Sequence, residues 1–287
     1  MTSRLPLDLN AYTRISRIVT KRVETLERKH ILMKSTRLAK FRKRIRGIFI
    51  LLNLKKGGRY ADLAYSTFLG DGIGTTHHLD FMEDGKFLSA FSNAVDDLPN
   101  GLRQNVAHDL GWRAHIVGWA AQHVLALPEK GDFVECGVFY GVLSKHIFNF
   151  VDFEQTDRKF FLFDTWGSEG SHPSYTEDIY EKVKLRFNYV NAILVRGKIP
   201  EILRSVKFNK IAYLSIDMNS YLPERAVLEF FYDKMIVGGI FYFDDYGWQG
   251  FPELRATVND FFADKPETLL QFPTGQSIAI KAGSRLY

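Results

Sequence analysis

The sequence predicts an α/β fold in which an open parallel sheet carries helices on both faces and an antiparallel strand at one edge. Three observations predict it. Residues 131–148, GDFVECGVFYGVLSKHIF, read as a strand, a glycine turn and a helix, the order that opens a nucleotide site in such sheets. Beyond them, short apolar runs alternate with segments of helical spacing. Two last apolar runs, 268–272 and 277–280, flank a turn at 273–276 and indicate the antiparallel edge.

Length and composition limit the possible classes of protein. At 287 residues with 46% hydrophobic content, the chain has room for one α/β domain and an appendage. No apolar run approaches the ~20 residues that cross a bilayer, and residues 1–10 do not form a secretory signal. The single cysteine, Cys136, excludes an intramolecular disulfide and favours a cytoplasmic location. Its surroundings favour a buried small hydrophobe over a thiol nucleophile.

The charge is unevenly distributed along the chain. Residues 1–60 hold 17 Lys and Arg against 3 Asp and Glu, whereas the remainder holds 21 against 30. Apolar residues recur at helical spacing between positions 15 and 26, so we expect a basic helical arm over 1–60. Its residues 1–56 can lie on an anionic membrane surface, giving a peripheral location, or pack against the body or a second subunit. Nucleic acid is not expected, because no recognition module accompanies the charge.

The remaining elements follow in order. Residues 61–104 are polar, with glycines at 70, 72 and 74, and predict a loop-rich cap before the main domain at 105–287. Aromatic and histidine residues at three- and four-residue steps predict a helix over 103–127. Further strands are expected at 160–163, 192–195, 211–216 and 240–243. Further helices are expected at 177–187, 223–232 and 255–262.

Acidic residues close four of the predicted strands: Glu135, Asp164, Asp217 and the pair Asp244-Asp245. The carboxyl ends of parallel strands share one edge of the sheet, and ligands bind there. Packing alone explains four acidic strand ends poorly, because clustered carboxylates repel one another unless a cation or a hydrogen-bond donor lies between them.

Two roles suit these acids. Asp164, after the second strand, is placed to accept hydrogen bonds from both hydroxyls of a ribose. Asp217, Asp244 and Asp245 offer the hard oxygen ligands that Mg²⁺ or a similar divalent ion prefers. The alternative for the last two is helix capping or a solvated loop. Asn219 can add an amide oxygen or cap the helix that follows.

Five segments carry a family resemblance: VECGVFYG, FDTWGSEG, RGKIPEIL, YLSIDMNSY and GGIFYFDDYGW. In order and spacing they resemble the class I S-adenosylmethionine-dependent methyltransferases. Within that class the chain is similar to the macrocin O-methyltransferase family, which methylates sugar hydroxyls with a divalent metal. The resemblance covers about residues 105–282. It implies a Rossmann-like sheet and a homo-oligomer, and the basic arm lies outside it.

The resemblance also implies a role for each site residue. It places these residues at the cofactor: Glu135, Gly137, Tyr140 and Gly141 at the methionine part, Asp164, Thr165 and Trp166 at the adenosine, and Arg196, Gly197 and Lys198 near the adenine. It places Asp217, Asp244 and Asp245 at the metal, expected to be Mg²⁺. Asn219 stands where the family carries a second acid.

The reaction that the resemblance implies is methyl transfer from S-adenosylmethionine to a hydroxyl of a sugar in a natural product or polysaccharide. Such an in-line displacement requires the acceptor oxygen to be aligned with the methyl group. Two vicinal hydroxyls bound to the metal would have lowered pKa values. Asp217 is the candidate to take the proton, and a histidine from another loop is the alternative.

Two other functions stay open. The first is a nicotinamide-dependent oxidoreductase on the same kind of sheet. The incomplete G-x-G-x-x-G fingerprint, of which only Gly137 and Gly141 are present, argues against it. The second is a non-catalytic protein that binds a partner through its basic arm.

Overall fold

The computed structural model describes residues 67–99, 102–103, 110–167, 175 and 177–283. The predicted basic arm at 1–60 and the first residues of the predicted cap lie outside this described part. Within it, no helix has the length and apolar character needed to cross a membrane.

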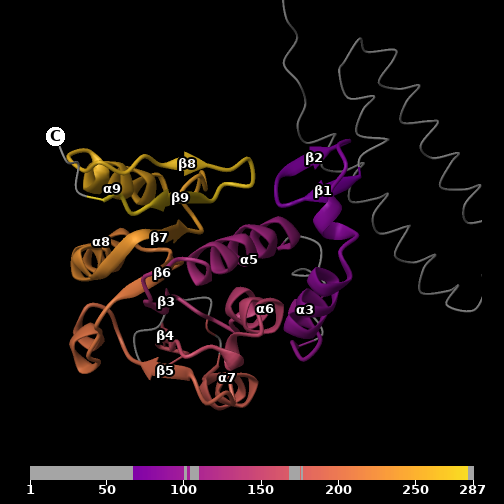
Figure 1. Ribbon diagram of the computed structural model, residues 1–287, viewed down its shortest axis with the longest axis horizontal. Coiled ribbons are helices and arrows are strands. Elements are labelled where there is room, and N and C mark those ends of the chain that lie inside the picture. The colour runs from indigo at the N-terminus through magenta and orange to yellow at the C-terminus, as the bar shows by residue number, and fades with distance from the viewer. Residues whose placement is uncertain (1–66, 100–101, 104–109, 168–174, 176, 284–287) are drawn as a thin grey trace, which may run out of the picture. The chain divides into compact units, whose positions relative to one another are not determined.

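In the described part of the chain, a seven-stranded sheet forms the centre of the main domain (Figure 1). In spatial order its strands are β5 (Ala192–Arg196), β4 (Phe160–Asp164), β3 (Asp132–Cys136), β6 (Ile211–Ile216), β7 (Met235–Phe243), β9 (Ser277–Ile280) and β8 (Leu270–Gln271). The first five run parallel, and β9 pairs antiparallel with β7. The strand order reverses between β3 and β6, which puts the switch point of the sheet at their carboxyl ends. The predicted fold class is confirmed.

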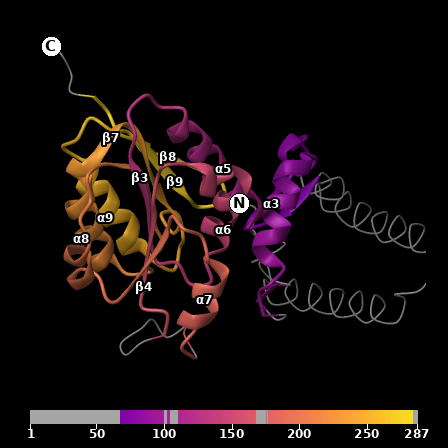
Figure 2. The same cartoon turned by 60° about the horizontal axis from the view of Figure 1, so that its bottom comes forward.

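Helices cover both faces of the sheet (Figure 2). One face carries α5 (Gly111–Leu125), α6 (Val142–Phe150) and α7 (Tyr180–Arg186), and the other carries α8 (Tyr221–Phe231) and α9 (Pro252–Phe262). Short 3₁₀ turns lie between the elements: η2 (Asp80–Met82), η3 (Phe153–Gln155), η4 (Glu201–Ser205) and η5 (Tyr232–Lys234). Because strand side chains alternate between faces, Phe133 and Phe160 pack with α5 and α6, whereas Val134 and Phe161 pack with α8 and α9. Cys136 is buried in the second of these cores, as predicted.

The cap contains more regular structure than the sequence predicts. A hairpin of β1 (Phe68–Gly70) and β2 (Ile73–Thr75) precedes α3 (Gly85–Val95), and α3 packs against α6. The Asp84 side chain accepts a hydrogen bond from the Phe87 N–H at 2.6 Å and caps this helix. The buried stripe of α3 consists of Phe87, Ala90, Ala94 and Val95. The loop-rich prediction is wrong over α3, where Phe87, Ala90 and Ala94 recur at the three- and four-residue steps of a helix face.

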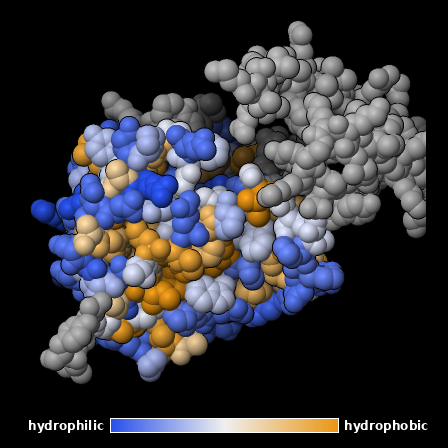
Figure 3. Space-filling model, turned by 90° about the horizontal axis from the view of Figure 1, so that it is seen from above, coloured by the Kyte–Doolittle hydropathy of each residue, from blue (hydrophilic) through white to orange (hydrophobic). Residues whose placement is uncertain are grey.

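The outer end of the sheet leaves apolar side chains exposed. Leu270 of β8 lies opposite Ile278 of β9, which is buried on the α5 side, so both side chains point to that face. α5 lies over β6 and β7. The side chains of Leu270, Ile280 and Trp119 are exposed. Viewed from the side on which β8 and β9 lie in Figure 1, apolar side chains gather near the middle of the surface (Figure 3). The homo-oligomer implied by the family resemblance stays a prediction.

A buried histidine in α6 makes the fold sensitive to acid. His146 is fully buried, and neither of its ring nitrogens has a hydrogen-bond partner among the described residues. Its ring lies against Phe87, Phe91 and Phe150. Burial, and to a smaller extent His115, lowers the pKa of His146 from 6.5 to about 4. The unfolded chain therefore binds a proton that the folded chain does not, and stability falls as the pH falls through this window.

The variant His146→Leu is expected to lose less stability in acid than the wild type. In the wild type, the titration of His146 should lower the free energy of unfolding by on the order of 3 kcal/mol between pH 7 and 4. The variant lacks this loss. Urea unfolding at several pH values measures the difference, with the exposed His78→Gln as the control. Equal pH slopes for the wild type and His146→Leu would contradict the assignment.

Candidate active site

The glycine turn after β3 brings the ends of β3 and β6 into contact. Gly137 has a φ of +86°, and a Cβ there would overlap the carbonyl oxygen of Asp217. Gly141, at the start of α6, has a φ of +66°, and a Cβ there would lie 2.5 Å from the Phe187 ring. Backbone conformation and neighbouring parts of the chain therefore require both glycines. Gly137 also lines a cavity, whereas Gly141 does not belong to its lining.

The carboxylate of Asp164, at the end of β4, organises this turn. Its Oδ2 accepts hydrogen bonds from the N–H groups of Val138 at 2.7 Å and Phe139 at 2.8 Å, and from the Tyr175 hydroxyl at 2.7 Å. Its Oδ1 accepts one from the N–H of Trp166 at 2.9 Å. Hydrogen bonds to a charged acceptor are the stronger kind, so one side chain fixes the loops after both β3 and β4.

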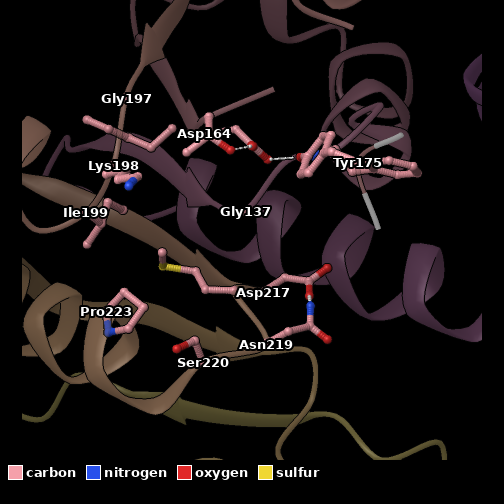
Figure 4. A pocket seen from close by; sticks show the side chains of 14 residues that line it. Gly137, Asp164, Tyr175, Gly197, Lys198, Ile199, Asp217, Asn219, Ser220 and Pro223 are labelled. Atoms are coloured by element: carbon pink, nitrogen blue, oxygen red, sulfur yellow. Dashed lines mark hydrogen bonds between the residues drawn. The ribbon is translucent and has the colours of Figure 1, made fainter. Parts of the chain in front are cut away.

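A cavity of about 510 Å³ opens at this edge of the sheet. It is lined by Gly137, Phe139, Phe163, Asp164, Thr165, Tyr175, Gly197, Lys198, Ile199, Asp217, Met218, Asn219, Ser220 and Pro223. Figure 4 shows Asp164 with Tyr175 on one side of the cavity and Asp217 with Asn219 on the other. The lining thus comes from the carboxyl ends of β3 to β6, the place where the sequence predicts a ligand.

The structure brings together half of the residues that the resemblance assigns to the cofactor. Those that line the cavity are Gly137, Asp164, Thr165, Gly197 and Lys198. Those outside its lining are Glu135, Tyr140, Gly141, Trp166 and Arg196. The second group supports the first instead of facing the cavity.

Two of these supporting residues act on the loop after β4. The indole N–H of Trp166 donates to the carbonyl oxygen of Phe139 at 3.0 Å, and the Trp166 side chain is fully buried. The guanidinium of Arg196 donates to the carbonyl oxygen of Thr165 at 3.2 Å and also pairs with Asp178. Both residues hold the backbone beside the cavity.

The other supporting residues lie deeper or farther away. Tyr140 is buried, and its carbonyl oxygen accepts a hydrogen bond from Arg186 at 2.9 Å. Glu135 is buried in β3. Burial, and then the charges of Asp244 and Asp164, raise the pKa of Glu135 well above its ordinary value. Glu135 therefore lies close enough to Asp244 and Asp164 for their negative charges to raise its pKa.

Tyr175 is a cavity residue that the sequence does not reveal. Its hydroxyl donates a hydrogen bond to Asp164 Oδ2, and both residues line the cavity. Its ring also contacts the Phe139 ring, with the centroids 5.4 Å apart. No local pattern marks it, because nothing in the sequence near Tyr175 connects it to Asp164, 11 positions earlier.

The variant Tyr175→Phe is expected to bind S-adenosylhomocysteine about tenfold more tightly than the wild type. The substitution removes a hydroxyl that competes for Asp164, and such a bond to a charged group is worth ~1.5–3 kcal/mol. Calorimetric titration measures the change, and Tyr180→Phe, an aromatic residue outside the cavity lining, is the matched control. Weaker binding by Tyr175→Phe would show that the hydroxyl contacts the ligand directly.

Three carboxylates converge beside the cavity, at the ends of β6 and β7. Asp217, Asp244 and Asp245 each offer an oxygen atom, and these atoms lie within 4.8 Å of one another. Asp245 Oδ2 is buried and has no hydrogen-bond partner among the described residues. Three carboxylate donors with one unused oxygen fit a hard divalent cation.

The electrostatics of the cluster also favour a cation. Burial, and then the charges of Asp244 and Asp245, raise the pKa of Asp217 well above its ordinary value. Burial and Asp244 raise the pKa of Asp245 to about 6. Asn219, whose φ is +54°, donates its side-chain N–H to Asp217 Oδ1 at 3.3 Å, so in this structure it orients an acid of the cluster.

Arg113 of α5 is a second residue that the sequence does not reveal. Its guanidinium pairs with Asp244, and it donates to both oxygens of Asp71, from Nη2 at 2.7 Å and from Nε at 2.9 Å. The hydroxyl of Tyr242 donates to the other oxygen of Asp244 at 2.6 Å. Burial alone would lower the pKa of Arg113, but Asp244 and Asp71 outweigh burial and raise it. Arg113 is therefore charged at every physiological pH.

The comparison with solved structures concerns this arrangement of sheet, cavity and acids. The O-methyltransferase NovP superposes on the chain with a TM-score of 0.52 and 19% identity, over 62% of this chain and 82% of that one. This chain has a class I methyltransferase fold. The methyltransferase fold accounts for the strand order, and it places the cavity at the switch point of the sheet.

Two further solved structures superpose on the chain with TM-scores below 0.5. The calicheamicin methyltransferase CalS11 has a TM-score of 0.46 and 16% identity, over 71% of this chain and 94% of that one. The Podospora anserina methyltransferase PaMTH1, in a structure with bound S-adenosylhomocysteine, has a TM-score of 0.49 and 10% identity, over 99% and 100% of the two chains. No family model matches the sequence. No curated protein matches it either.

Proposed function

We propose that this chain is an S-adenosylmethionine-dependent O-methyltransferase whose acceptor is a sugar hydroxyl and whose reaction a divalent cation assists. The observation that carries the proposal is that a cavity and a cluster of carboxylates lie at the same edge of a methyltransferase fold. A cavity headed by Asp164 lies beside a cluster of three carboxylates, and Asp217 belongs to both. The similarity of the fold to that of the O-methyltransferase NovP supports O-methyl transfer. The motif resemblance to the macrocin O-methyltransferase family supports the sugar acceptor and the metal.

The cavity fits the proposed cofactor. A volume of about 510 Å³ is within the range of small-molecule sites. Asp164 would accept a ribose hydroxyl in place of Tyr175, and Gly197 leaves room beside it. When bound, S-adenosylmethionine supplies a methyl group on a positively charged sulfur. The cavity lining carries the carboxyl groups of Asp164 and Asp217, which favour a cationic ligand.

The carboxylate cluster fits the proposed cation. Asp217, Asp244 and Asp245 would be its ligands, and Mg²⁺ would supply a Lewis acid that lowers the pKa of bound hydroxyl groups. The unpartnered Oδ2 of Asp245 is the clearest sign of a missing positive group. Asn219 orients Asp217, and Tyr242 orients Asp244.

The reaction needs alignment and one proton acceptor. The acceptor hydroxyl would bind beside Asp217, S-adenosylmethionine would supply the methyl group, and the thioether would be the leaving group. The proton of the hydroxyl passes to Asp217, the acid that both cavity and cluster share. The walls of the cavity hold the two reacting atoms in line.

The test is the formation of S-adenosylhomocysteine by the full chain with S-adenosylmethionine and a panel of glycosides and nucleotide sugars that carry vicinal hydroxyls. We expect turnover with at least one acceptor, and we expect EDTA to abolish it and Mg²⁺ to restore it. Turnover that EDTA leaves unchanged would contradict the metal. Turnover with phenolic acceptors and none with any sugar would contradict the acceptor class.

A further inference from the structure

Arg113 pairs with one acid of the carboxylate cluster, and it comes from outside the strands that form the cluster. It lies 131 positions before Asp244 in the sequence, on α5, and its side chain is 16% exposed. Asp244 is 5% exposed and Asp71 is 8% exposed. A buried guanidinium between two buried carboxylates interacts strongly, because little water screens the charges.

The hydrogen bonds divide Arg113 unequally between its two partners. Asp71 accepts two hydrogen bonds in a fork, one on each oxygen, whereas Asp244 accepts one. The fork is the geometry in which Arg binds a carboxylate most firmly. Asp71 lies in the turn of the β1–β2 hairpin, so the cap holds Arg113 from the side opposite the cluster.

Asp244 does not depend on Arg113 for its orientation. The Tyr242 hydroxyl donates to Asp244 Oδ1 at 2.6 Å, and Tyr242 is fully buried in β7. Loss of Arg113 would therefore remove a positive charge from the cluster and leave its carboxylate in place. A positive charge beside three carboxylates opposes the binding of a second cation there.

We infer that Arg113 is an internal counter-ion that competes with the divalent cation for Asp244, and that Asp71 weakens this competition by holding Arg113 in a fork. The inference rests on the metal site of the proposed function and adds two positioning residues to it. Together they set how tightly the cluster binds a cation. Arg113 offsets part of the negative charge of the cluster when no cation is bound, and Asp71 keeps Arg113 from neutralising Asp244 fully.

The opposite effects of two substitutions test the inference. The metal used is Mn²⁺, whose binding to the full chain is measured by calorimetry and by the electron paramagnetic resonance signal of the free ion. Arg113→Gln should bind Mn²⁺ about tenfold more tightly than the wild type. Asp71→Asn should bind it about fivefold more weakly, because Arg113 then pairs with Asp244 alone. A purely structural role would change both affinities in the same direction.

Two further variants serve as controls, one for an unpaired buried charge and one for the loss of an ion pair between cap and body. The double variant Asp71→Asn with Arg113→Gln leaves no unpaired buried charge at the pair, and it too should bind Mn²⁺ more tightly than the wild type. Asp152→Asn breaks the exposed ion pair between Lys86 and Asp152, another link of the cap to the body, and should leave the affinity unchanged within twofold. Thermal unfolding provides a second readout, and Mn²⁺ should raise the Tm of Arg113→Gln more than that of the wild type.

The outcomes separate this inference from the proposed function. Weaker Mn²⁺ binding by Arg113→Gln and by the double variant would overturn the inference, as would Mn²⁺ binding by Asp71→Asn equal to that of the wild type. Absence of Mn²⁺ binding by the wild type would overturn it as well. Titration of S-adenosylhomocysteine into the same proteins tests the cofactor site independently, so either result can stand without the other.

Discussion

Replacing Asp164 by Ala is expected to reduce S-adenosylhomocysteine binding at least a hundredfold. The carboxylate accepts hydrogen bonds from the N–H groups of Val138 and Phe139, and it is the cavity residue placed to receive a ribose hydroxyl. Its loss leaves two donors in the glycine turn without this acceptor, at ~1–3 kcal/mol for each one that stays buried. The variant therefore loses both the contact to the ligand and the shape of the turn. Calorimetric titration measures the affinity.

Two controls separate these contributions. Asp157→Ala removes an exposed acid that pairs with Lys130, and it should bind the ligand like the wild type. Asp164→Asn keeps one carbonyl oxygen for the turn, so it should fold like the wild type and lose about tenfold in affinity. Affinities within threefold of the wild type for both Asp164 variants would remove Asp164 from the cofactor site.

Replacing Asp217 by Asn is expected to reduce methyl transfer by a factor of about 1000, because Asp217 is both a ligand of the proposed cation and the proposed proton acceptor. S-adenosylhomocysteine affinity should change by less than about threefold, since the carboxylate placed for the ribose is that of Asp164. Steady-state turnover at saturating Mg²⁺ measures the first effect and calorimetry measures the second.

The control for Asp217 is Asp233→Asn, which removes an exposed acid from the turn after α8. It should retain full turnover. Activity of Asp217→Asn above a tenth of the wild-type value would transfer the role of proton acceptor to another group. The histidine alternative would then become the leading candidate.

The five parallel strands of the sheet could be predicted because each is a short apolar run with an acid or a glycine at or just beyond its end. Asp164, Asp217 and Asp244 stand at the carboxyl edge of the sheet, as alternation of strands and helices implies. The helix α3 was missed although its sequence carries the signal: Asp84 is a capping residue, and Phe87, Ala90 and Ala94 recur at three- and four-residue steps. The glycines at 70, 72 and 74 just before it favoured a loop instead.

The site could be predicted in part. The acids of the cluster converge as the strand order requires. The sequence does not reveal that Arg113, itself bound to Asp71, contacts Asp244 of the cluster, or that Tyr175 contacts Asp164. No spacing rule connects Arg113 to Asp244 across 131 positions. The resemblance drew attention to the loops after β4 and β5, which contribute to the cavity lining, but a motif does not separate residues that line a cavity from those that hold the lining. Trp166 belongs to the second kind.

The most direct test of the methyltransferase assignment is a pair of calorimetric titrations of the wild-type chain, one with S-adenosylhomocysteine and one with NAD⁺. We expect saturable binding of one S-adenosylhomocysteine per chain and no binding of NAD⁺. Saturable binding of NAD⁺ without binding of S-adenosylhomocysteine would contradict the methyltransferase assignment and favour an oxidoreductase on the same sheet.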